Sequence, residues 1–441
     1  MATAQKQGPF WRREVLAGIT TFASMAYILV VNPGMLAITG MDANALVTAT
    51  ALSAIVGTLL MAALTNYPIA LAPGMGLNAF FTFTICGQLE IPWQGALGLV
   101  FWTGVLFLIL SASGFREQVV KAIPDALKTG IQAGIGLFIL VIGLKNIGLF
   151  GDPAPRFIAL QWAGFSNVPW QILLIAAIGL IAILLLYRLR FAGAILCGVA
   201  LATIVGLFLS LNGTPVTPTP NSVVSKPASL APILFQVDWL YPFKNPGTAW
   251  IPLLTLVFVD LFDTIGTLIG VSRQAGLTDK NGNLPKMRQA LLADAGATTV
   301  GACLGTSPVT SYIESATGIE AGGKTGWTSV TVAICFLLAL FFHPILTAIP
   351  AAAVAPALLM VGGMMMVGLK RLDWKDWRAA IPALAIVLLI PLNFQIAEGI
   401  AAGFVLYTIL MYATGQWKRV HWFLAVLSAL FLVKLIADIA K

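Results

Sequence analysis

Long apolar runs follow one another along almost the whole chain, separated by short polar connections. They predict helices near 15–31, 46–65, 69–86, 94–112, 122–144, 168–187, 191–210, 250–272, 288–304, 307–319, 326–347, 350–368, 379–392 and 396–414. Glycine and proline interrupt the third and tenth runs. The one long polar stretch, 211–248, is rich in proline and separates seven runs from seven. A final run, 421–438, contains Lys434 and either crosses a membrane or lies along its interface.

The lengths of these runs and the composition indicate an all-α polytopic membrane protein. The chain has 441 residues, of which 59% are hydrophobic and only 10% are charged, whereas a soluble domain carries about 25% charged residues. About 20 apolar residues are needed for a helix to span the hydrocarbon core of a bilayer. A transmembrane β-barrel would show alternating segments of about ten residues, so the continuous apolar runs exclude it.

The net charge of +8 is interpreted as membrane orientation and not as a nucleic-acid surface. When the N-terminus is placed in the cytosol, most basic residues of the connections fall on the cytosolic side, and only Lys145, Arg156, Lys226 and Lys244 fall outside. This asymmetry follows the positive-inside rule, provided that both interrupted runs are spans. We therefore predict fourteen spans with a cytosolic N-terminus, the first span being retained and not cleaved as a signal peptide.

The two groups of seven spans carry traces of an internal repeat. The tripeptide AIP at 122–124 precedes GLK at 143–145, and AIP at 348–350 precedes GLK at 368–370 with nearly the same separation. Because seven is odd, the two copies would run in opposite directions. Spans broken by glycine and proline at corresponding places of two inverted halves are a sequence sign of a transporter site near the midplane.

Acidic residues occur inside these apolar runs, where an unpaired carboxylate is costly. The eighth run, LVFVDLFDTIGTLIGV, contains Asp260 and Asp263. In a helix their spacing of three places both on one face, which Thr264 and Thr267 continue. The tenth run contains Glu314 among small and apolar residues. Three buried acids therefore need partners or a ligand.

The polar groups expected near the midplane come from spans three, eight and ten. They are Asn78, Asp260, Asp263, Thr264, Thr267, Ser307, Thr310, Ser311 and Glu314, with Phe80, Phe81 and Phe83 as a stacking or packing surface. This acid-rich set suits a cation or a planar heterocycle rich in N–H donors, and it suits an anion poorly. Buried carboxylates can exchange protons during turnover, so we predict proton-coupled uptake with Asp263 and Glu314 at the ligand and Asp260 in proton coupling.

Structural roles are the alternatives for these residues. Asp260, Asp263 or Glu314 could tie helices together, and Asn78 could cap a half-helix. Asp294 is expected near the cytosolic end of the ninth span, in a packing or capping role.

The tenth span is expected to restart as a half-helix directly after its break. Thr306 or Ser307 would cap that half-helix, with Pro308 at its first position. The cysteines and histidines have no metal-type spacing, so no metal site is predicted. The Gly74-x-Gly76 pair is no phosphate loop, because no lysine follows it in a strand-to-helix context.

Several long motifs closely resemble the AzgA-like adenine/guanine/hypoxanthine permeases of the nucleobase cation symporter-2 group. They are AGITTFASMAYILVVNP (17–33), APGMGLNAFF (72–81), FVDLFDTIGTLIGV (258–271), GTSPVTSYIESATGIEAGGKTG (305–326) and IAEGIAAGF (396–404). The resemblance covers nearly the whole chain.

This resemblance implies fourteen transmembrane segments in 7+7 inverted repeats, with short extended pieces in broken spans 3 and 10 and elevator-type alternating access. A core domain (spans 1–4 and 8–11) would hold the substrate, and a gate domain (spans 5–7 and 12–14) would face it and supply a homodimer contact. The corresponding boundaries are 1–13 for the cytosolic N-terminus, 14–112 and 249–347 for the core domain, 113–210 and 348–414 for the gate domain, 211–248 for the extracytoplasmic inter-repeat loop, and 415–441 for the C-terminal segment.

The resemblance also implies roles for single residues. Asp263 matches the substrate-binding acid of span eight, and Glu314 matches the acid of span ten. Asn78 matches the recognition asparagine of the purine permeases, and Asp260 matches their second acid in span eight. Thr267 stands where the uracil carriers have a histidine, which puts the transfer of their proton path in doubt.

The predicted function is import of purine nucleobases by proton symport across a bacterial inner membrane, with the proton gradient as driving force and no cofactor. The intact MGLNAFF and VDLFD motifs resemble the guanine/hypoxanthine branch more than the adenine branch. The N1–H and 2-amino groups of guanine could also donate together to one carboxylate. The alternatives are an adenine-preferring permease, an anion transporter of the same fold, a cation channel, and an intramembrane enzyme that uses paired acids.

Overall fold

The computed structural model describes residues 10–113, 122–151, 162–211, 213–220, 222–277, 284–393 and 395–439. Its first-half helices are α1 (Phe10–Met25), α2 (Ile28–Leu36), α3 (Ala43–Thr65), α4 (Met75–Ala79), the π-helix η2 (Phe80–Gln88), α5 (Trp93–Ser113), α7 (Asp125–Asn146), α8 (Trp170–Arg188) and α9 (Ala194–Phe208). Those that follow are α10 (Tyr241–Lys244), α11 (Pro246–Gln274), α12 (Met287–Leu304), α13 (Ser315–Glu320), α14 (Gly326–Ala339), α15 (His343–Thr347), α16 (Ala351–Met366), α17 (Trp377–Asn393), α18 (Ile396–Ala413) and α19 (Trp422–Ile439).

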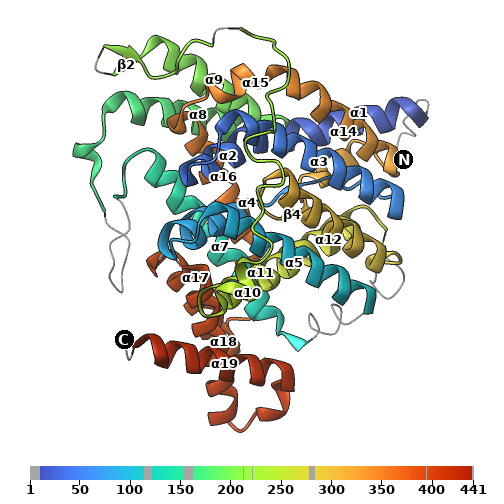
Figure 1. Ribbon diagram of the computed structural model, residues 1–441, viewed down its shortest axis with the longest axis vertical. Helices are drawn as coiled ribbons and strands as arrows, with labels where there is room; N and C mark the ends of the chain where they lie inside the picture. The colour runs from blue at the N-terminus through green and yellow to red at the C-terminus, as the bar shows by residue number, and fades with distance from the viewer. Residues whose placement is uncertain are drawn as a thin grey trace, which may run out of the picture.

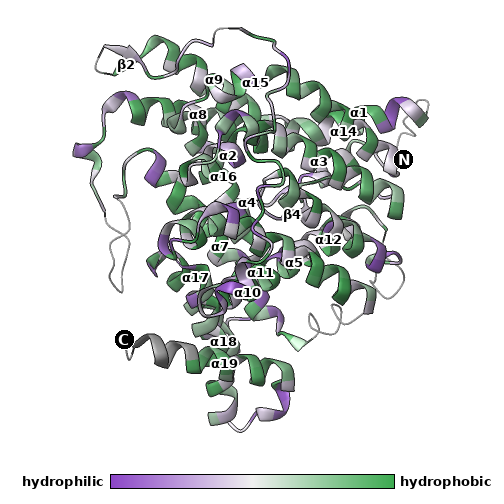
Figure 2. Ribbon diagram, in the orientation of Figure 1, coloured by the Kyte–Doolittle hydropathy of each residue, from purple (hydrophilic) through white to green (hydrophobic). Residues whose placement is uncertain are grey.

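The apolar runs form helices that fit a membrane. Within the described residues, nine helical segments are long and apolar enough to cross a bilayer, and α9, α17 and part of α19 are shorter apolar helices. Figure 2 shows hydrophobic residues along the helices and hydrophilic residues mainly at their ends. The prediction of an all-α polytopic membrane protein is confirmed.

The N-terminal region is described from Phe10 onward, and its first apolar run differs from the prediction. Of the predicted cytosolic segment 1–13, residues 1–9 lie outside the described residues, and Phe10 already begins α1. The first apolar run is also not one continuous helix, because a turn at Ala26 and Tyr27 separates α1 from α2. This third break in a span carries a fully buried tyrosine, Tyr27.

The interrupted third and tenth runs each contain a short extended piece, as predicted. Strand β1 (Leu71–Pro73) pairs antiparallel with β4 (Val309–Ser311), with Leu71 opposite Ser311 and Pro73 opposite Val309. Figure 1 shows β4 in the middle of the molecule, between helices of both halves of the chain. The expected cap at Thr306 or Ser307 is wrong, because the chain after Pro308 is extended and α13 begins only at Ser315.

Two threonines close the outer edges of this two-stranded sheet. The hydroxyl of Thr58 in α3 accepts from the backbone N–H of Leu71 at 2.9 Å and donates to its carbonyl at 3.0 Å. The hydroxyl of Thr298 in α12 treats Val309 in the same way, at 3.2 and 2.9 Å. Because unpaired backbone groups are very costly in a membrane interior, these two side chains allow an open sheet edge there.

Valine at either threonine is expected to lower the free energy of unfolding by about 1–3 kcal/mol, because it leaves a buried N–H and a buried C=O without partners at nearly unchanged volume. Thermal unfolding of the purified protein in detergent would measure this loss. Thr20→Val is the matched control, since among the described residues the Thr20 hydroxyl bonds only the Leu16 carbonyl of its own helix. Equal melting temperatures for all three variants would contradict the proposed edge closure.

Helix packing repeats between the two halves of the chain. The contact of α3 with α14 has its counterpart in that of α12 with α5. The contact of α1 with α14 corresponds to that of α11 with α5, and the contact of α1 with α13 corresponds to that of α11 with α4. Likewise, α16 packs on α8 as α17 packs on α7, and α8 packs on α9 as α17 packs on α18. These contacts of one half therefore recur in the other half with the partners exchanged.

The central pair α7 and α16 is packed through two equivalent glycines. A Cβ on Gly136 would lie 2.7 Å from the Gly362 carbonyl oxygen, and a Cβ on Gly362 would lie 2.5 Å from the Gly136 carbonyl oxygen. Both glycines stand twelve positions after the proline of their AIP tripeptide (124 to 136 and 350 to 362). The weak sequence repeat thus coincides with a reciprocal contact in the structure.

The remaining segments lie at the edges of this arrangement. In the stretch 211–248, a short hairpin forms from β2 (Ser210–Leu211) and β3 (Thr214–Pro215), and α10 packs on α5 and α11. Figure 1 shows α19 at one edge beside α18. The Ser428 hydroxyl joins these two helices, lying 2.8 Å from the Thr408 hydroxyl and donating to the Phe404 carbonyl at 3.1 Å.

Candidate functional site

A cavity of about 120 Å³ lies where the broken spans meet. One wall, which we call the acid wall, comes from the α1–α2 break, the start of α4, α11 and the segment from β4 to α13. The opposite wall comes from α7 and α16. The residues that line the cavity are Tyr27, Gly74, Met75, Gly76, Gln132, Asp263, Thr267, Thr310, Ser311, Tyr312, Ile313, Glu314, Val361, Met364 and Met365. Five of the nine polar residues predicted near the midplane are therefore brought together here.

Glu314 is fixed at the cavity by a tyrosine from the first span. It occupies the residue before α13 and is 8% exposed. The Tyr27 hydroxyl donates to its Oε1 atom at 2.5 Å. Because α1 ends at Met25 and α2 begins at Ile28, the break between them sets the position of Tyr27. The second carboxylate oxygen, Oε2, has no protein donor within the described residues, so a ligand can use it.

Asp263 reaches the same cavity from α11, beside the start of α4. A Cβ on Gly74 would lie 3.6 Å from Asp263 Oδ2 and 2.6 Å from Cγ2 of Thr310. Glycine at position 74 therefore allows the third span, the tenth span and the acid of α11 to approach closely. This close approach explains why the MGLN motif is preceded by a glycine.

A buried network of hydroxyls and acids begins behind the cavity wall. The Thr264 hydroxyl lies 2.8 Å from the Thr310 hydroxyl, 2.8 Å from Asp294 Oδ1 and 3.4 Å from Asp260 Oδ1. Asp260 and Asp294 are fully buried, and neither lines the cavity. Asp294 stands in the middle of α12 and not near its end, so the expectation of a terminal capping position is wrong.

The acid wall also carries an unsatisfied hydroxyl. Ser311 is 3% exposed, and its Oγ atom finds no hydrogen-bond partner among the described residues. Buried hydroxyls are nearly always paired with protein or water. Together with the free side of Glu314, this group indicates a cavity built to receive a polar ligand. No lysine, arginine or histidine is among the described residues that line it.

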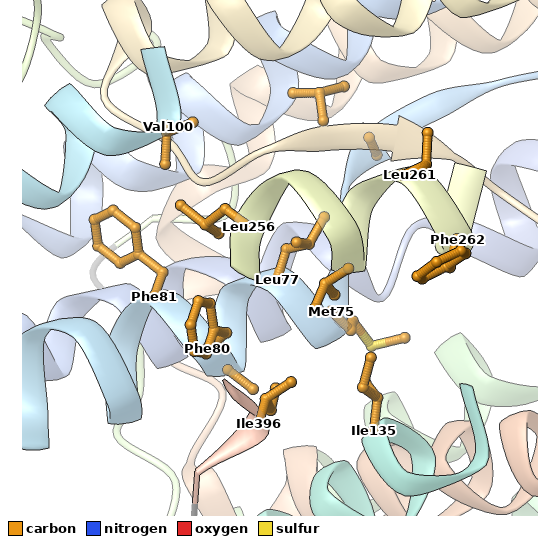
Figure 3. Packing of buried hydrophobic residues seen from close by; sticks show 14 of the residues in the cluster. Met75, Leu77, Phe80, Phe81, Val100, Ile135, Leu256, Leu261, Phe262 and Ile396 are labelled. Atoms are coloured by element: carbon orange, nitrogen blue, oxygen red, sulfur yellow. The ribbon is translucent and has the colours of Figure 1, made fainter. Parts of the chain in front are cut away.

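Asn78 and Phe80 do not line this cavity. Asn78 is fully buried and its Oδ1 accepts from the Ser307 hydroxyl, while its Nδ2 has no partner within the described part of the chain. Asn32 joins the same cluster by donating to the Thr50 and Thr306 hydroxyls at 2.7 and 2.9 Å. Figure 3 shows Phe80 and Phe81 among buried hydrophobic side chains.

A second, larger cavity of about 310 Å³ lies between α2, α3, η2 and the ends of α7 and α16. Its lining is almost wholly apolar, with Asn146 and Thr347 as its only hydrogen-bonding side chains among the described residues. It lacks the convergent polar groups of a binding site for a polar ligand. We therefore take the smaller, acid-lined cavity as the candidate site.

A sequence profile described as "Permease family" (Xan_ur_permease) matches residues 12–402. The chain belongs to this family. It is 44% identical over 436 residues to a putative permease of Methanocaldococcus jannaschii, covering 98% of this chain and 96% of that protein. It is 41% identical over 437 residues to the guanine/hypoxanthine permease PbuO of Bacillus subtilis, covering 96% and 97%. It is 37% identical over 432 residues to the adenine permease AdeP of Escherichia coli, covering 98% and 94%.

Solved structures show the fold of the permease. The transmembrane domain of the cyanobacterial bicarbonate transporter BicA superposes with a TM-score of 0.66 at 16% identity, covering 89% of this chain and 97% of that one. The structure of SLC26A9 gives a TM-score of 0.64 at 14% identity, covering 91% and 65%. At such identities the likeness concerns the fold alone. By its membership of the permease family and its apolar helices, the chain is a multi-pass membrane transporter and not an enzyme.

Several lining residues of the permease were missed by sequence reasoning. Tyr27 and Tyr312 lie in the quoted motifs and each could have been noticed as an amphipathic side chain inside an apolar run. Gln132 is a lone amide in the fifth apolar run. Met364 and Met365 carry no polar signal, and only the packing of α16 against α7 brings them to the cavity.

Proposed function

We propose that this permease imports purine nucleobases by proton symport. The observation that carries the proposal is that Asp263 and Glu314 enter one cavity from different spans, with no basic residue among its described lining. Two carboxylates can take the ring and exocyclic N–H groups of a purine, because ionised carboxylates accept hydrogen bonds at both oxygens. The hydroxyls of Thr310, Thr267 and Ser311 can meet ring nitrogen or carbonyl oxygen.

Guanine and hypoxanthine are the proposed preferred substrates. Both present an N1–H donor, and guanine adds a 2-amino group that could donate to the same carboxylate. Adenine has no N–H at N1. The relatives include proteins named as guanine/hypoxanthine permeases and as adenine permeases, so their names do not decide between the branches. An adenine-preferring permease is therefore the alternative.

An anion transporter is the second alternative, because the chain shares its fold with a bicarbonate transporter. The charge of the lining weighs against it. Asp263 and Glu314 line the cavity itself, and Asp294 and Asp260 are linked to it through Thr310 and Thr264. Like charges in a low dielectric repel strongly, so an anion would bind only against this field.

Proton coupling is proposed to run through the network behind the acid wall. Thr310 lines the cavity, and its hydroxyl is hydrogen-bonded to Thr264, which in turn contacts Asp294 and Asp260. Hydroxyl groups can both donate and accept, so this chain can pass a proton between the cavity and a buried acid. Asp260 keeps its proposed coupling role, and Asp294 joins it.

The proposed architecture is fourteen spans in two inverted repeats of seven. This arrangement is supported by the helix contacts that recur between the halves, by the threonines that close both edges of the sheet, and by the reciprocal glycine contact. The acid wall would then belong to the core domain and α7 and α16 to the gate domain, which would move relative to each other as an elevator. A cytosolic N-terminus, a homodimer and a location in a bacterial inner membrane complete the proposal.

Uptake of radiolabelled hypoxanthine into purine-transport-deficient cells tests the function. We expect saturable uptake that unlabelled guanine competes and a protonophore abolishes, whereas uracil competes weakly. Stronger competition by adenine than by guanine would favour the alternative of an adenine-preferring permease. Absence of uptake of every base by well-expressed protein, together with bicarbonate or sulfate transport, would replace the purine proposal by the anion alternative.

A further inference from the structure

The two walls of the cavity differ in chemistry. The acid wall carries most of the described polar groups that line the cavity, among them Tyr27, Asp263, Thr310 and Glu314. The opposite wall consists of Gln132 from α7 and of Val361, Met364 and Met365 from α16. Among the described lining residues, Gln132 is thus the only one on that wall able to form a strong hydrogen bond.

Gln132 lies on a helix that is closely packed, and its amide remains unengaged. Gln132 stands one helical turn before Gly136, whose close contact with Gly362 fixes α7 against α16. Its side chain is partly exposed, and neither end of its amide has a hydrogen-bond partner among the described residues. The amide lies near Gly368, where a Cβ would be 3.8 Å from Oε1. The amide can turn over, so either its N–H or its oxygen can face the cavity.

We propose that Gln132 binds the 6-substituent and N7 of the purine, an inference that rests on the proposed function. If the acids take the edge with N1 and the 2-position, the edge with the 6-substituent and N7 faces the opposite wall. A glutamine can bind adenine through N6 and N7 at once, and it can donate to O6 or N7 of guanine and hypoxanthine. Gln132 therefore lets one cavity accept both 6-oxo and 6-amino purines.

The placement of Gln132 on α7 adds a second property. On the opposite wall, dispersion contacts are all that Val361, Met364 and Met365 can offer. Without Gln132, only the acid wall would form hydrogen bonds with the base, and only along one edge. With a hydrogen bond from Gln132 on α7, the base is bound to both walls at once. This bond breaks if the acid wall, with the base attached, moves past α7 and α16. Gln132 thus contributes to affinity in the conformation described here.

The test is the ratio of adenine to hypoxanthine affinity in competition uptake by wild type, Gln132→Glu and Gln132→Met. A carboxylate only accepts hydrogen bonds, so Gln132→Glu should shift the ratio toward adenine by about tenfold or more. Gln132→Met keeps the volume without hydrogen bonding and should weaken both bases with little change in the ratio. Thr129→Glu is the charge control, because Thr129 lies one turn earlier on α7 and does not line the cavity.

A second measurement uses 7-deazahypoxanthine, which lacks the N7 acceptor. Wild type should bind it about tenfold more weakly than hypoxanthine, and Gln132→Met should not distinguish the two. An unchanged adenine ratio in Gln132→Glu, an equal shift in Thr129→Glu, or a deaza effect that persists in Gln132→Met would overturn the inference. Wild type that carries no purine at all would instead overturn the proposed function, so the two failures are distinguishable.

Discussion

Asparagine at Asp263 or glutamine at Glu314 is expected to reduce purine uptake by at least about 100-fold while the protein stays folded. Each carboxylate is proposed to accept N–H groups of the base, and hydrogen bonds to a charged group contribute about 1.5–3 kcal/mol each. An amide replaces one acceptor oxygen by a donor that faces another donor. Two such bonds lost or reversed exceed about 3 kcal/mol, which corresponds to more than a factor of 100 in affinity.

Initial uptake rates over a range of hypoxanthine concentrations would measure this loss, with size-exclusion profiles of the purified variants as the test of folding. In Glu314→Gln the remaining side-chain oxygen can still accept from Tyr27, so the contact with the first span is kept. Asp125→Asn is the matched control, because that side chain is 97% exposed and, among the described residues, pairs with Lys128 at the protein surface. Uptake within threefold of wild type in either acid variant would show that this acid does not bind the cargo.

Burial of an acid within an apolar run did not by itself identify the site. Glu14 in α1 is 2% exposed and thus even more buried than Glu314, which is 8% exposed. Its carboxylate accepts from the Thr328 hydroxyl at 2.6 Å and from the backbone N–H groups of Lys324 and Thr325. Structural donors therefore occupy it. Glu314 differs from Glu14 because it has a carboxylate oxygen that is free to bind a ligand in a cavity. The position of a cavity cannot be inferred from the sequence.

The elements themselves could be predicted because lipid imposes a simple rule. Continuous apolar length determines where helices form, and glycine and proline determine where spans three and ten break. The break between α1 and α2 could not be predicted in this way, because its two residues, Ala26 and Tyr27, are neither glycine nor proline. The extended geometry after Pro308 was also missed, because a capping residue followed by proline fits a strand start as well as a helix start.

Side-chain partners across the interior were the least predictable feature. A polar residue on an inward helix face looks the same in sequence whether it reaches the cavity or a neighbouring helix. Asn78 illustrates this, because it follows Gly74 and Gly76 by less than two turns and yet bonds Ser307 away from the cavity. Gln132 illustrates the reverse, since only the contact of α7 with the start of α4 makes it a lining residue.

Alanine at Gly76 is expected to reduce uptake by about tenfold or more by blocking the contact between the two walls. A Cβ at position 76 would lie 2.5 Å from Cγ2 of Ile135, and the next nearest atoms, Cβ and Cδ1 of the same residue, would lie at 3.8 and 3.9 Å. Figure 3 shows Ile135 on α7 next to Met75 at the start of α4. The added methyl group thus leaves the acid wall intact and clashes with α7 alone. Overpacking of this kind costs about 1–3 kcal/mol in a buried contact.

The clash can be removed from the other side. Ile135→Ala deletes Cγ2 and leaves Cβ 3.8 Å from the new methyl group, an ordinary contact distance. The double variant should therefore recover uptake and melting temperature relative to Gly76→Ala, and the recovery measures the coupling between the two residues. Gly363→Ala on α16 is the control, since no atom of the described residues, its own helix backbone and chain neighbours apart, lies within 4 Å of its Cβ position. If Ile135→Ala brought no recovery, the loss would come from the methyl group filling the cavity, and the two walls would not meet at Gly76 during transport.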